Sequence, residues 1–501
     1  MKKIMANSAA ALVAQIVSVI CGLVLPRLIL ESFGSEINGL TQSIKQFLGV
    51  ISFLDLGVGQ VMRSALYRPL AKKDDKQLSC VMCSGRKFYK RLACILMGYV
   101  LVLMVVYPML AEVEFGWLYV ATLILAMAIS SFAQYYFGIA NEQLLQADQR
   151  GYVVFLLQIV GNILNVVASV WAIRAGASIQ VVKTVTALVF LLRPIGVWLY
   201  VRRHYHVDRK VQYAADPITQ KKDGMAQHIS AVVLDGTDTI VLTFLSTLTN
   251  VSIYSVYYMV IASIQGLYQS TTAGIQSAAG LLWAQRDTEG INRMFMRVEM
   301  LLHAAVTFVF SCTAVLIVPF VRVYTNGLTD AEYVQPVFAA LLVLAYGIRS
   351  LRTPYNIWIL AAGHYRQTRK CHILAASINV VVSIVAVSRW GLIGVAIGTL
   401  VAMVYQTLWM AWYSTKTLLK RPAGSVAKRF LIDALMAVLI CLLTRGISLM
   451  NLDYLSWCWM AVKVALVSMM VICGVLCLFY RKDVRQIIEP WLRGSKMGSR
   501  L

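Results

Sequence analysis

Long apolar segments dominate the pattern of hydrophobic and polar positions along this chain. Residues 94–110 and 153–173 contain no charged residue, and residues 461–480 contain one base, Lys463, and no acid. An α-helix of about 20 apolar residues is long enough to cross the hydrocarbon core of a bilayer. The pattern therefore predicts several membrane-spanning helices.

Fourteen segments of this kind follow one another with short connections. We predict helices at residues 9–30, 38–62, 92–112, 117–140, 152–173, 178–201, 225–247, 251–282, 298–321, 335–360, 371–389, 391–415, 430–448 and 457–480. The fold class expected from this series is all-α, a polytopic membrane protein with about 14 transmembrane helices.

A weak internal repeat divides the series. Residues 64–74 and 277–287 are identical at four of eleven positions, and they lie 213 residues apart. Each string follows the second helix of a half, and six helices separate the two copies, so both halves have the same orientation. We therefore expect an N-terminal lobe (1–222), a C-terminal lobe (223–424) and an appendix of two further helices with a basic tail (425–501).

Composition excludes several protein classes. Hydrophobic residues make up 59% of the chain and charged residues only 14%, which is unlike a soluble enzyme, a fibrous protein or a disordered chain. The net charge of +23 arises mainly because Lys and Arg concentrate in alternate connections, which places both termini in the cytoplasm. No soluble module carries a clustered basic face, so nucleic acid is not an expected partner.

Motifs of enzyme chemistry are missing from the sequence. There is no P-loop, HExxH or GxSxG motif, and every exterior connection is short. Cys80-x-x-Cys83 lies in a lysine-rich loop without a second pair of ligands, so we expect no metal site. The chain is therefore expected to have no enzymatic activity and no cofactor.

A polar stripe runs along the predicted helix 38–62. Its members are spaced three or four residues apart: Asn38, Gln42, Lys45, Gly49, Ser52, Asp55, Gly59 and Arg63. This spacing predicts one continuous helical face. Such a face could line a water-filled cavity or make hydrogen bonds between helices, and the sequence leaves both explanations open.

Charged residues within the predicted spans suggest what a cavity would bind. Bases predominate at the candidate substrate positions: Arg27, Lys45, Arg63, Lys183, Arg349 and Arg352. Guanidinium groups bind phosphate through two parallel hydrogen bonds, so these residues favour an anionic substrate. The alternative for Arg349 and Arg352 is an ion pair with embedded acids, namely Asp55, Asp235 or Asp238. Arg193 and Asp433 lie near inner helix ends, where we expect their side chains to reach water.

The N-terminal region resembles a known transporter family. FGSEINGL (33–40), FLDLG (53–57) and PLAKKD (69–74) are similar to segments of Wzx-type polysaccharide flippases. These flippases belong to the multidrug/oligosaccharidyl-lipid/polysaccharide exporter superfamily, together with MATE drug exporters and MurJ lipid II flippases. The resemblance covers the whole chain in topology and is specific in sequence mainly over residues 1–90.

The resemblance implies two six-helix lobes that form a V and open alternately to each side of a bacterial cytoplasmic membrane. A cationic cavity would accept the pyrophosphate and glycan of an undecaprenyl-linked repeat unit for capsule or O-antigen-like polysaccharide, while the lipid tail stays in the bilayer. Arg27, Lys45, Arg349 and Arg352 fit this role.

Further implications concern energy and partners. The embedded acids are candidates for proton or sodium coupling. Membrane lipids would be partners, as would a glycan polymerase and glycosyltransferases of the same pathway. The alternative function is a MATE-like ion-coupled antiporter for drugs or cations.

Overall fold

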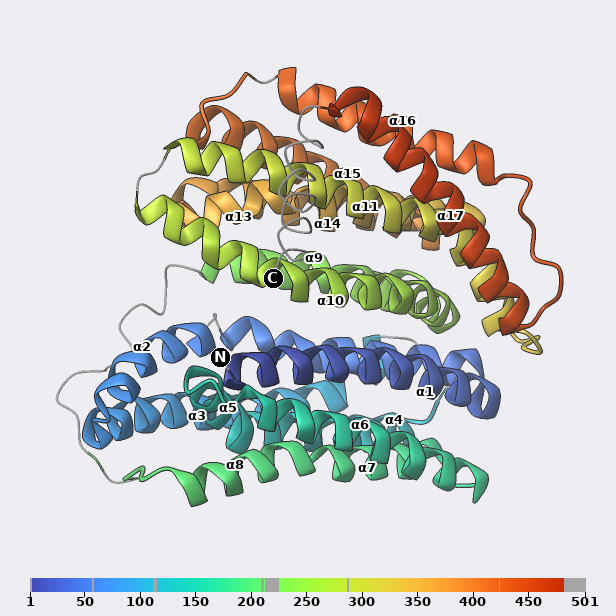
Figure 1. Ribbon diagram of the computed structural model, residues 1–501. Coiled ribbons are helices and arrows are strands. Elements are labelled where there is room, and N and C mark those ends of the chain that lie inside the picture. Colours follow the sequence, from blue (N-terminus) through green and yellow to red (C-terminus); the bar gives the residue numbers. More distant parts are fainter. Residues whose placement is uncertain are drawn as a thin grey trace, which may run out of the picture. The chain divides into compact units, whose positions relative to one another are not determined.

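The computed structural model describes residues 2–55, 58–110, 115–208, 211, 225–285, 288–422 and 424–481. Within these ranges every regular element is a helix (Figure 1). Eleven helical segments of the described chain are long and apolar enough to cross a membrane. The predicted all-α, polytopic fold is confirmed, and the protein is a multi-pass membrane protein.

Packing divides the chain into two compact units, Met1–Met259 and Val260–Leu501. The boundary falls inside one helix, α10 (Leu248–Ala284), whose first turns pack with the preceding helices.

The first unit begins with α1 (Lys2–Gly49), which contains the first predicted span and the start of the second, with a turn of the chain at Gly34 between them. The φ angle of Gly34 is 83°, a left-handed conformation that glycine adopts without steric cost. The remaining elements of this unit are η1 (Val50–Asp55), α2 (Val58–Lys72), α3 (Asp75–Leu110), α4 (Trp117–Ala133), the π-helix η2 (Gln134–Gly138), α5 (Ile139–Ala147), α6 (Gly151–Arg174), α7 (Ile179–Phe190), α8 (Leu192–His204) and α9 (Met225–Leu245).

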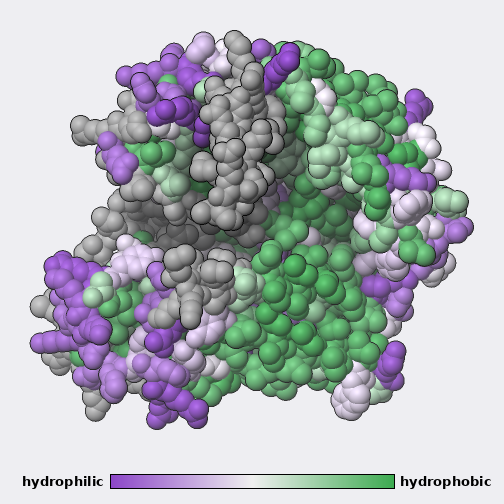
Figure 2. Space-filling view, viewed as in Figure 1, coloured by the Kyte–Doolittle hydropathy of each residue, from purple (hydrophilic) through white to green (hydrophobic). Residues whose placement is uncertain are grey.

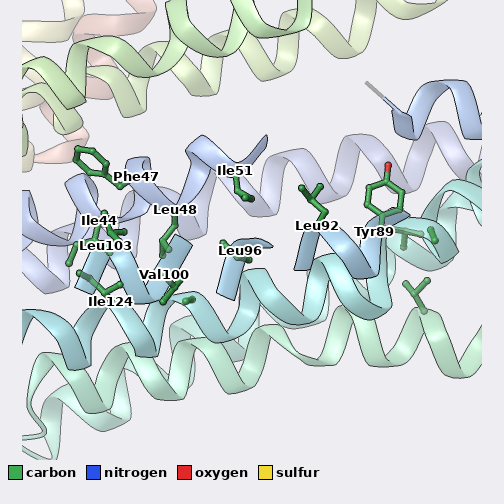
Figure 3. Close-up of a cluster of buried hydrophobic side chains, with 14 of the residues drawn as sticks. Ile44, Phe47, Leu48, Ile51, Tyr89, Leu92, Leu96, Val100, Leu103 and Ile124 are labelled. Carbon is green, nitrogen blue, oxygen red and sulfur yellow. The ribbon is translucent and has the colours of Figure 1, made fainter. Parts of the chain in front are cut away.

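The core of the first unit forms between the second part of α1, α3 and α4. Figure 3 shows Ile44 and Leu48 of α1 beside Leu96 and Val100 of α3, and all four side chains are buried. Their spacing of four residues places each pair on one helical face. This face fixes the orientation of α1 beyond Gly34 and therefore the direction of its polar residues.

The second unit contains the rest of α10 and seven further helices with a π-helix between two of them: α11 (Thr288–Tyr324), α12 (Pro336–Leu351), α13 (Thr353–Ala361), α14 (Tyr365–Trp390), α15 (Leu392–Tyr413), η3 (Ser414–Leu418), α16 (Gly424–Thr444) and α17 (Tyr454–Phe479). One predicted span is divided between α12 and α13 by Pro354, which has no N–H to donate to the carbonyl of Ser350. The hydroxyl of Tyr268 donates to that carbonyl instead, at 3.3 Å.

Helix positions support the internal repeat. Helices α3 and α11 begin at Asp75 and Thr288, which are 213 residues apart, as are the first residues of α7 and α15, Ile179 and Leu392. The fourteen predicted spans can be matched to the described helices. For this, α1 counts as two spans, and each of the series α4–η2–α5, α7–α8, α12–α13 and α15–η3 counts as one. The lobe boundaries predicted at 222 and 424 come from the internal repeat, whereas the two compact units are defined by packing. The lobe boundaries therefore stay predictions.

The second predicted span is not one continuous α-helix, and here the prediction is wrong. The α-helix ends at Gly49, the chain continues as a 3₁₀ helix to Asp55, and α2 begins only at Val58. Because a 3₁₀ helix has three residues per turn instead of 3.6, the polar stripe does not stay on one face. Glycine has a low helix propensity, and Gly49, Gly57 and Gly59 cluster at this interruption.

Candidate functional site

Two embedded lysines from distant parts of the sequence come together in the first unit. Lys45 lies on α1 beyond its turn and Lys183 lies on α7, and their ammonium groups are close enough to repel each other. The Lys45 side chain is exposed and the Lys183 side chain is half-buried. Among the residues that the structure describes, no carboxylate pairs with either lysine. The pair is therefore a concentrated positive charge suited to an anion.

The surroundings of Lys45 show that its helix uses polar residues in two ways. Asn38 is fully buried, and its amide donates to the hydroxyl of Ser252 at 2.7 Å. The hydroxyls of Ser43 and Thr243 lie 2.7 Å apart in a second buried contact. Hydrogen bonds between helices thus account for the start of the polar stripe, whereas Lys45 keeps an accessible surface.

Two other predicted bases of the first unit have nearby polar partners. Arg27 forms an ion pair of 2.6 Å with Glu31, one turn further along α1. The Nε atom of Arg63 on α2 donates to the side-chain oxygen of Gln143 on α5 at 3.0 Å. The charge of Arg27 is therefore partly neutralised within its own helix.

The predicted acids of the first unit sit at helix contacts. Asp55, the last residue of η1, accepts a hydrogen bond of 3.0 Å from the hydroxyl of Tyr89. Asp238 on α9 is buried and accepts one of 2.9 Å from the hydroxyl of Tyr254. Asp235 lies three residues earlier on α9 and is half-buried. Phenol donors thus orient two of the three carboxylates.

The remaining predicted bases belong to the second unit. Arg349 lies in the last turn of α12, with its guanidinium carbon 5.7 Å from the centre of the Tyr346 ring. Arg352 lies at the junction of α12 and α13, close enough to Cys371 and His372 of α14 to act on them electrostatically. Their predicted ion pairs with acids of the first unit stay predictions.

Two ion pairs were missed by the sequence reasoning. Arg193 donates to both carboxylate oxygens of Glu142, at 2.8 and 2.9 Å, beside the π-helix η2. His303 on α11 contacts Asp433 on α16 at 2.5 Å, and both side chains are buried. The prediction that Asp433 reaches water is therefore wrong, whereas the Arg193 side chain keeps about one third of its surface exposed. Only the shared membrane level of Glu142 and Arg193 hinted at their pairing.

Metal-binding chemistry finds no support in the described ranges, where no group of three or more His, Cys, Asp or Glu side chains gathers in a suitable arrangement. The geometry of the site is instead that of a cationic surface within membrane-spanning helices.

Comparison with known proteins gives a clear result at the level of fold. No protein-family profile and no curated protein sequence matches the chain. A structure of the lipid II flippase MurJ in an inward closed conformation matches with a TM-score of 0.73 and 13% identity, covering 96% of this chain and 99% of that one. An inward-facing MATE family multidrug resistance transporter of the MOP superfamily matches with a TM-score of 0.60 and 16% identity, covering 82% and 99%.

A third similar structure is a MOP superfamily transporter from Pyrococcus furiosus, described as having a binding pocket of reverse polarity. It matches with a TM-score of 0.59 and 15% identity over 84% of this chain and 97% of that one. At these identities the likeness concerns the fold, which this chain shares with MurJ and MATE transporters.

Proposed function

We propose that this protein is a flippase that moves an undecaprenyl-pyrophosphate-linked oligosaccharide from the inner to the outer leaflet by alternating access. The substrate would be a repeat unit for capsule or O-antigen-like polysaccharide. The protein would lie in the bacterial cytoplasmic membrane with both termini in the cytoplasm. The fold shared with MurJ and with MATE transporters supports a transport function, and the charge of the candidate site supports the choice of substrate.

The observation that carries the proposal is the proximity of Lys45 and Lys183. Like charges within a membrane repel each other more strongly than in water, because the effective dielectric constant is lower. A pyrophosphate group carries more than one negative charge, so it can contact both ammonium groups and convert their repulsion into attraction. A cationic drug would add to the repulsion.

The other predicted residues would act around this pair. Arg27, Arg63, Arg349 and Arg352 would bind further phosphate or glycan oxygens as the protein changes conformation. Asp55, Asp235 and Asp238 would couple the cycle to protons or sodium ions. A glycan polymerase and glycosyltransferases of the same pathway would be the functional partners.

The test compares lysine variants in a strain that lacks the native gene. We expect Lys45→Gln and Lys183→Gln to leave undecaprenyl-linked glycan accumulated on the inner leaflet, as the deletion does. Purified Lys45→Gln should bind undecaprenyl pyrophosphate at least about tenfold more weakly, because a hydrogen bond to a charged group contributes about 1.5–3 kcal/mol. Lys45→Arg, which keeps the charge, should retain most of the binding.

The matched control is Lys463→Gln. Lys463 is an exposed lysine of the spanning helix α17, with its ammonium 5.6 Å from the centre of the Trp459 ring and far along the chain from the lysine pair. This variant should export glycan normally. Normal export by both Lys45→Gln and Lys183→Gln would refute the site, and the same result for Arg349→Ala and Arg352→Ala would refute the role of those arginines.

A second candidate function is that of a MATE-like ion-coupled antiporter for drugs or cations. The buried carboxylate of Asp238, oriented by Tyr254, favours it because such a group can exchange a proton for a cation. In that case the deletion strain would become sensitive to cationic drugs without accumulating lipid-linked glycan, and Asp238→Asn would reproduce the sensitivity.

A further inference from the structure

A large cavity among the described residues lies entirely within the first unit, on the side of α3. Its volume is about 1330 Å³, and it opens between α3, the segment η2–α5 and α8. The lining residues are Cys83, Arg86, Lys87, Lys90, Arg91, Cys94, Ile95, Tyr136, Phe137, Ala140, Asn141, Trp198 and Val211. We call this cavity the α3 pocket.

The charge of the α3 pocket has one sign. Its four bases belong to two adjacent rows on one face of α3, and no lining residue is acidic. Arg86 donates to the side-chain oxygen of Asn141 at 2.9 Å, so its guanidinium is held in place. Lys87, Lys90 and Arg91 are exposed, and no carboxylate of the described chain pairs with them. Asp208 lies at the rim, where its backbone oxygen accepts from the Cys83 thiol at 3.3 Å and its carboxylate is close enough to act on that thiol.

The rest of the wall is apolar and aromatic. The ammonium of Lys90 lies 4.9 Å from the centre of the Tyr136 ring. Ile95 and Phe137 are exposed, and Trp198 is half-buried. Aromatic side chains of this kind gather where a membrane protein passes through the headgroup region of the bilayer.

The position of the α3 pocket along its helix is consistent with the headgroup region of the bilayer. The bases end at Arg91, and the apolar part of α3 begins with Leu92. Figure 2 shows hydrophilic residues at the end of the first unit where α2 joins α3, and hydrophobic residues over α1 and α6. A molecule in the pocket would therefore have a charged end beside the bases and an apolar end toward the hydrocarbon.

The internal repeat provides an independent comparison. At the offset of 213 residues, the four bases correspond to Glu299, Met300, His303 and Ala304 on α11. In the second unit this surface is covered by α16: His303 contacts Asp433, and Arg429 donates to the carbonyl of Met300 at 2.9 Å. A protein helix thus occupies in one half a surface that, among the described residues, is exposed and basic in the other.

We propose that the α3 pocket binds an anionic phospholipid. Its headgroup phosphate would contact Lys87, Lys90 and Arg91, and its acyl chains would lie against Ile95, Phe137 and Trp198. Basic pockets between membrane helices bind anionic lipid headgroups in the same way, because their positive charge lies at the level of the headgroups. This lipid takes the place that α16 takes in the second unit, and its binding is independent of the transported substrate.

The first measurement is lipid binding to the purified full-length protein by native mass spectrometry. The probes are phosphatidylglycerol, phosphatidylcholine and inorganic phosphate. We expect the wild type to bind phosphatidylglycerol preferentially, and the variant Lys87→Gln/Lys90→Gln/Arg91→Gln to bind it about 100-fold more weakly, because each base near a membrane surface contributes about a factor of five. The control Arg366→Gln/Arg369→Gln/Lys370→Gln removes three exposed bases from α14 and should bind like the wild type.

A second measurement does not depend on the triple variant folding. Phosphatidylglycerol with brominated acyl chains should quench tryptophan fluorescence of the wild type, and the quenched fraction should fall in Trp198→Phe. Equal binding of phosphatidylcholine, unchanged binding by the triple variant, or unchanged quenching in Trp198→Phe would each overturn the proposal. Binding of inorganic phosphate as tight as that of phosphatidylglycerol would overturn it too, because the ligand would then be a free anion.

Discussion

Replacement of Gly39 by alanine tests how closely α1 packs in the first unit. A Cβ atom at this position would lie 1.8 Å from the carbonyl oxygen of Leu248 and 2.6 Å from its carbonyl carbon. A carbon–oxygen contact requires about 3.3 Å, so α1 and the start of α10 would have to separate by about 1.5 Å. Both partners are backbone atoms, which cannot rotate away as a side chain could.

The expected free-energy change combines two opposing effects. Overpacking costs about 1–3 kcal/mol, and we take the upper end because backbone must move. Alanine gains about 1 kcal/mol over glycine in helix propensity, which leaves a net destabilisation of about 2 kcal/mol. For a unit of this size, such a loss lowers the midpoint of thermal unfolding by roughly 4–8 °C.

The assay is thermal unfolding in detergent, followed by intrinsic tryptophan fluorescence. Gly22→Ala is the matched control, because Gly22 lies on the same helix and a Cβ there would meet no atom within 4 Å. This control should leave stability unchanged or raise it. If Gly39→Ala were as stable as Gly22→Ala, the close approach of α1 to Leu248 would be refuted.

Two further predictions concern the ion pairs His303–Asp433 and Arg193–Glu142. Asp433→Ala should destabilise the packing of α16 on α11 by about 3 kcal/mol, because His303 loses its buried partner, and limited proteolysis should then cut between α16 and α17 faster than in the wild type. Glu142→Gln should cost about 1–2 kcal/mol of unfolding free energy, a smaller loss because Arg193 is about one-third exposed. A double-mutant cycle with Arg193→Gln should show strong coupling, and additive effects would contradict a direct pair.

Hydropathy predicted the existence of the spanning helices but not where the helices begin. Helix α3 was expected from residue 92 and begins at Asp75, and α11 was expected from 298 and begins at Thr288. Hydropathy detects the part of a helix that lies in hydrocarbon, whereas backbone hydrogen bonds continue through a polar segment. The basic turns of α3 were therefore predicted as a loop, and their ordered face could not be foreseen.

Local sequence also could not predict the interruption after Gly49. The polar residues of the predicted span 38–62 have helical spacing throughout, and only the glycines at 49, 57 and 59 indicated weakness. Whether a glycine-rich segment stays helical depends on the helices that pack against it. That information lies in contacts between residues far apart in the chain.

For the candidate site, the sequence identified embedded charges without their partners. Lys45 and Lys183 were both recognised from their positions in apolar segments, but their proximity depends on α4, which packs against both α1 and α7. The same limit explains why Arg193 was expected to reach water. A base near the end of a span can extend to solvent or pair with an acid on another helix, and sequence spacing does not distinguish the two outcomes.

Pairing changes which charges can attract a substrate. Arg193 is neutralised by Glu142, and Arg27 is partly neutralised by Glu31, so neither contributes its full charge. Lys45 and Lys183 instead lie near each other, and among the described residues neither has a carboxylate partner. An anion that binds both lysines stabilises the charged state of the pair. The proposed selectivity for a diphosphate therefore depends on two lysines acting together, and removing either one should abolish most of the preference that the pair provides.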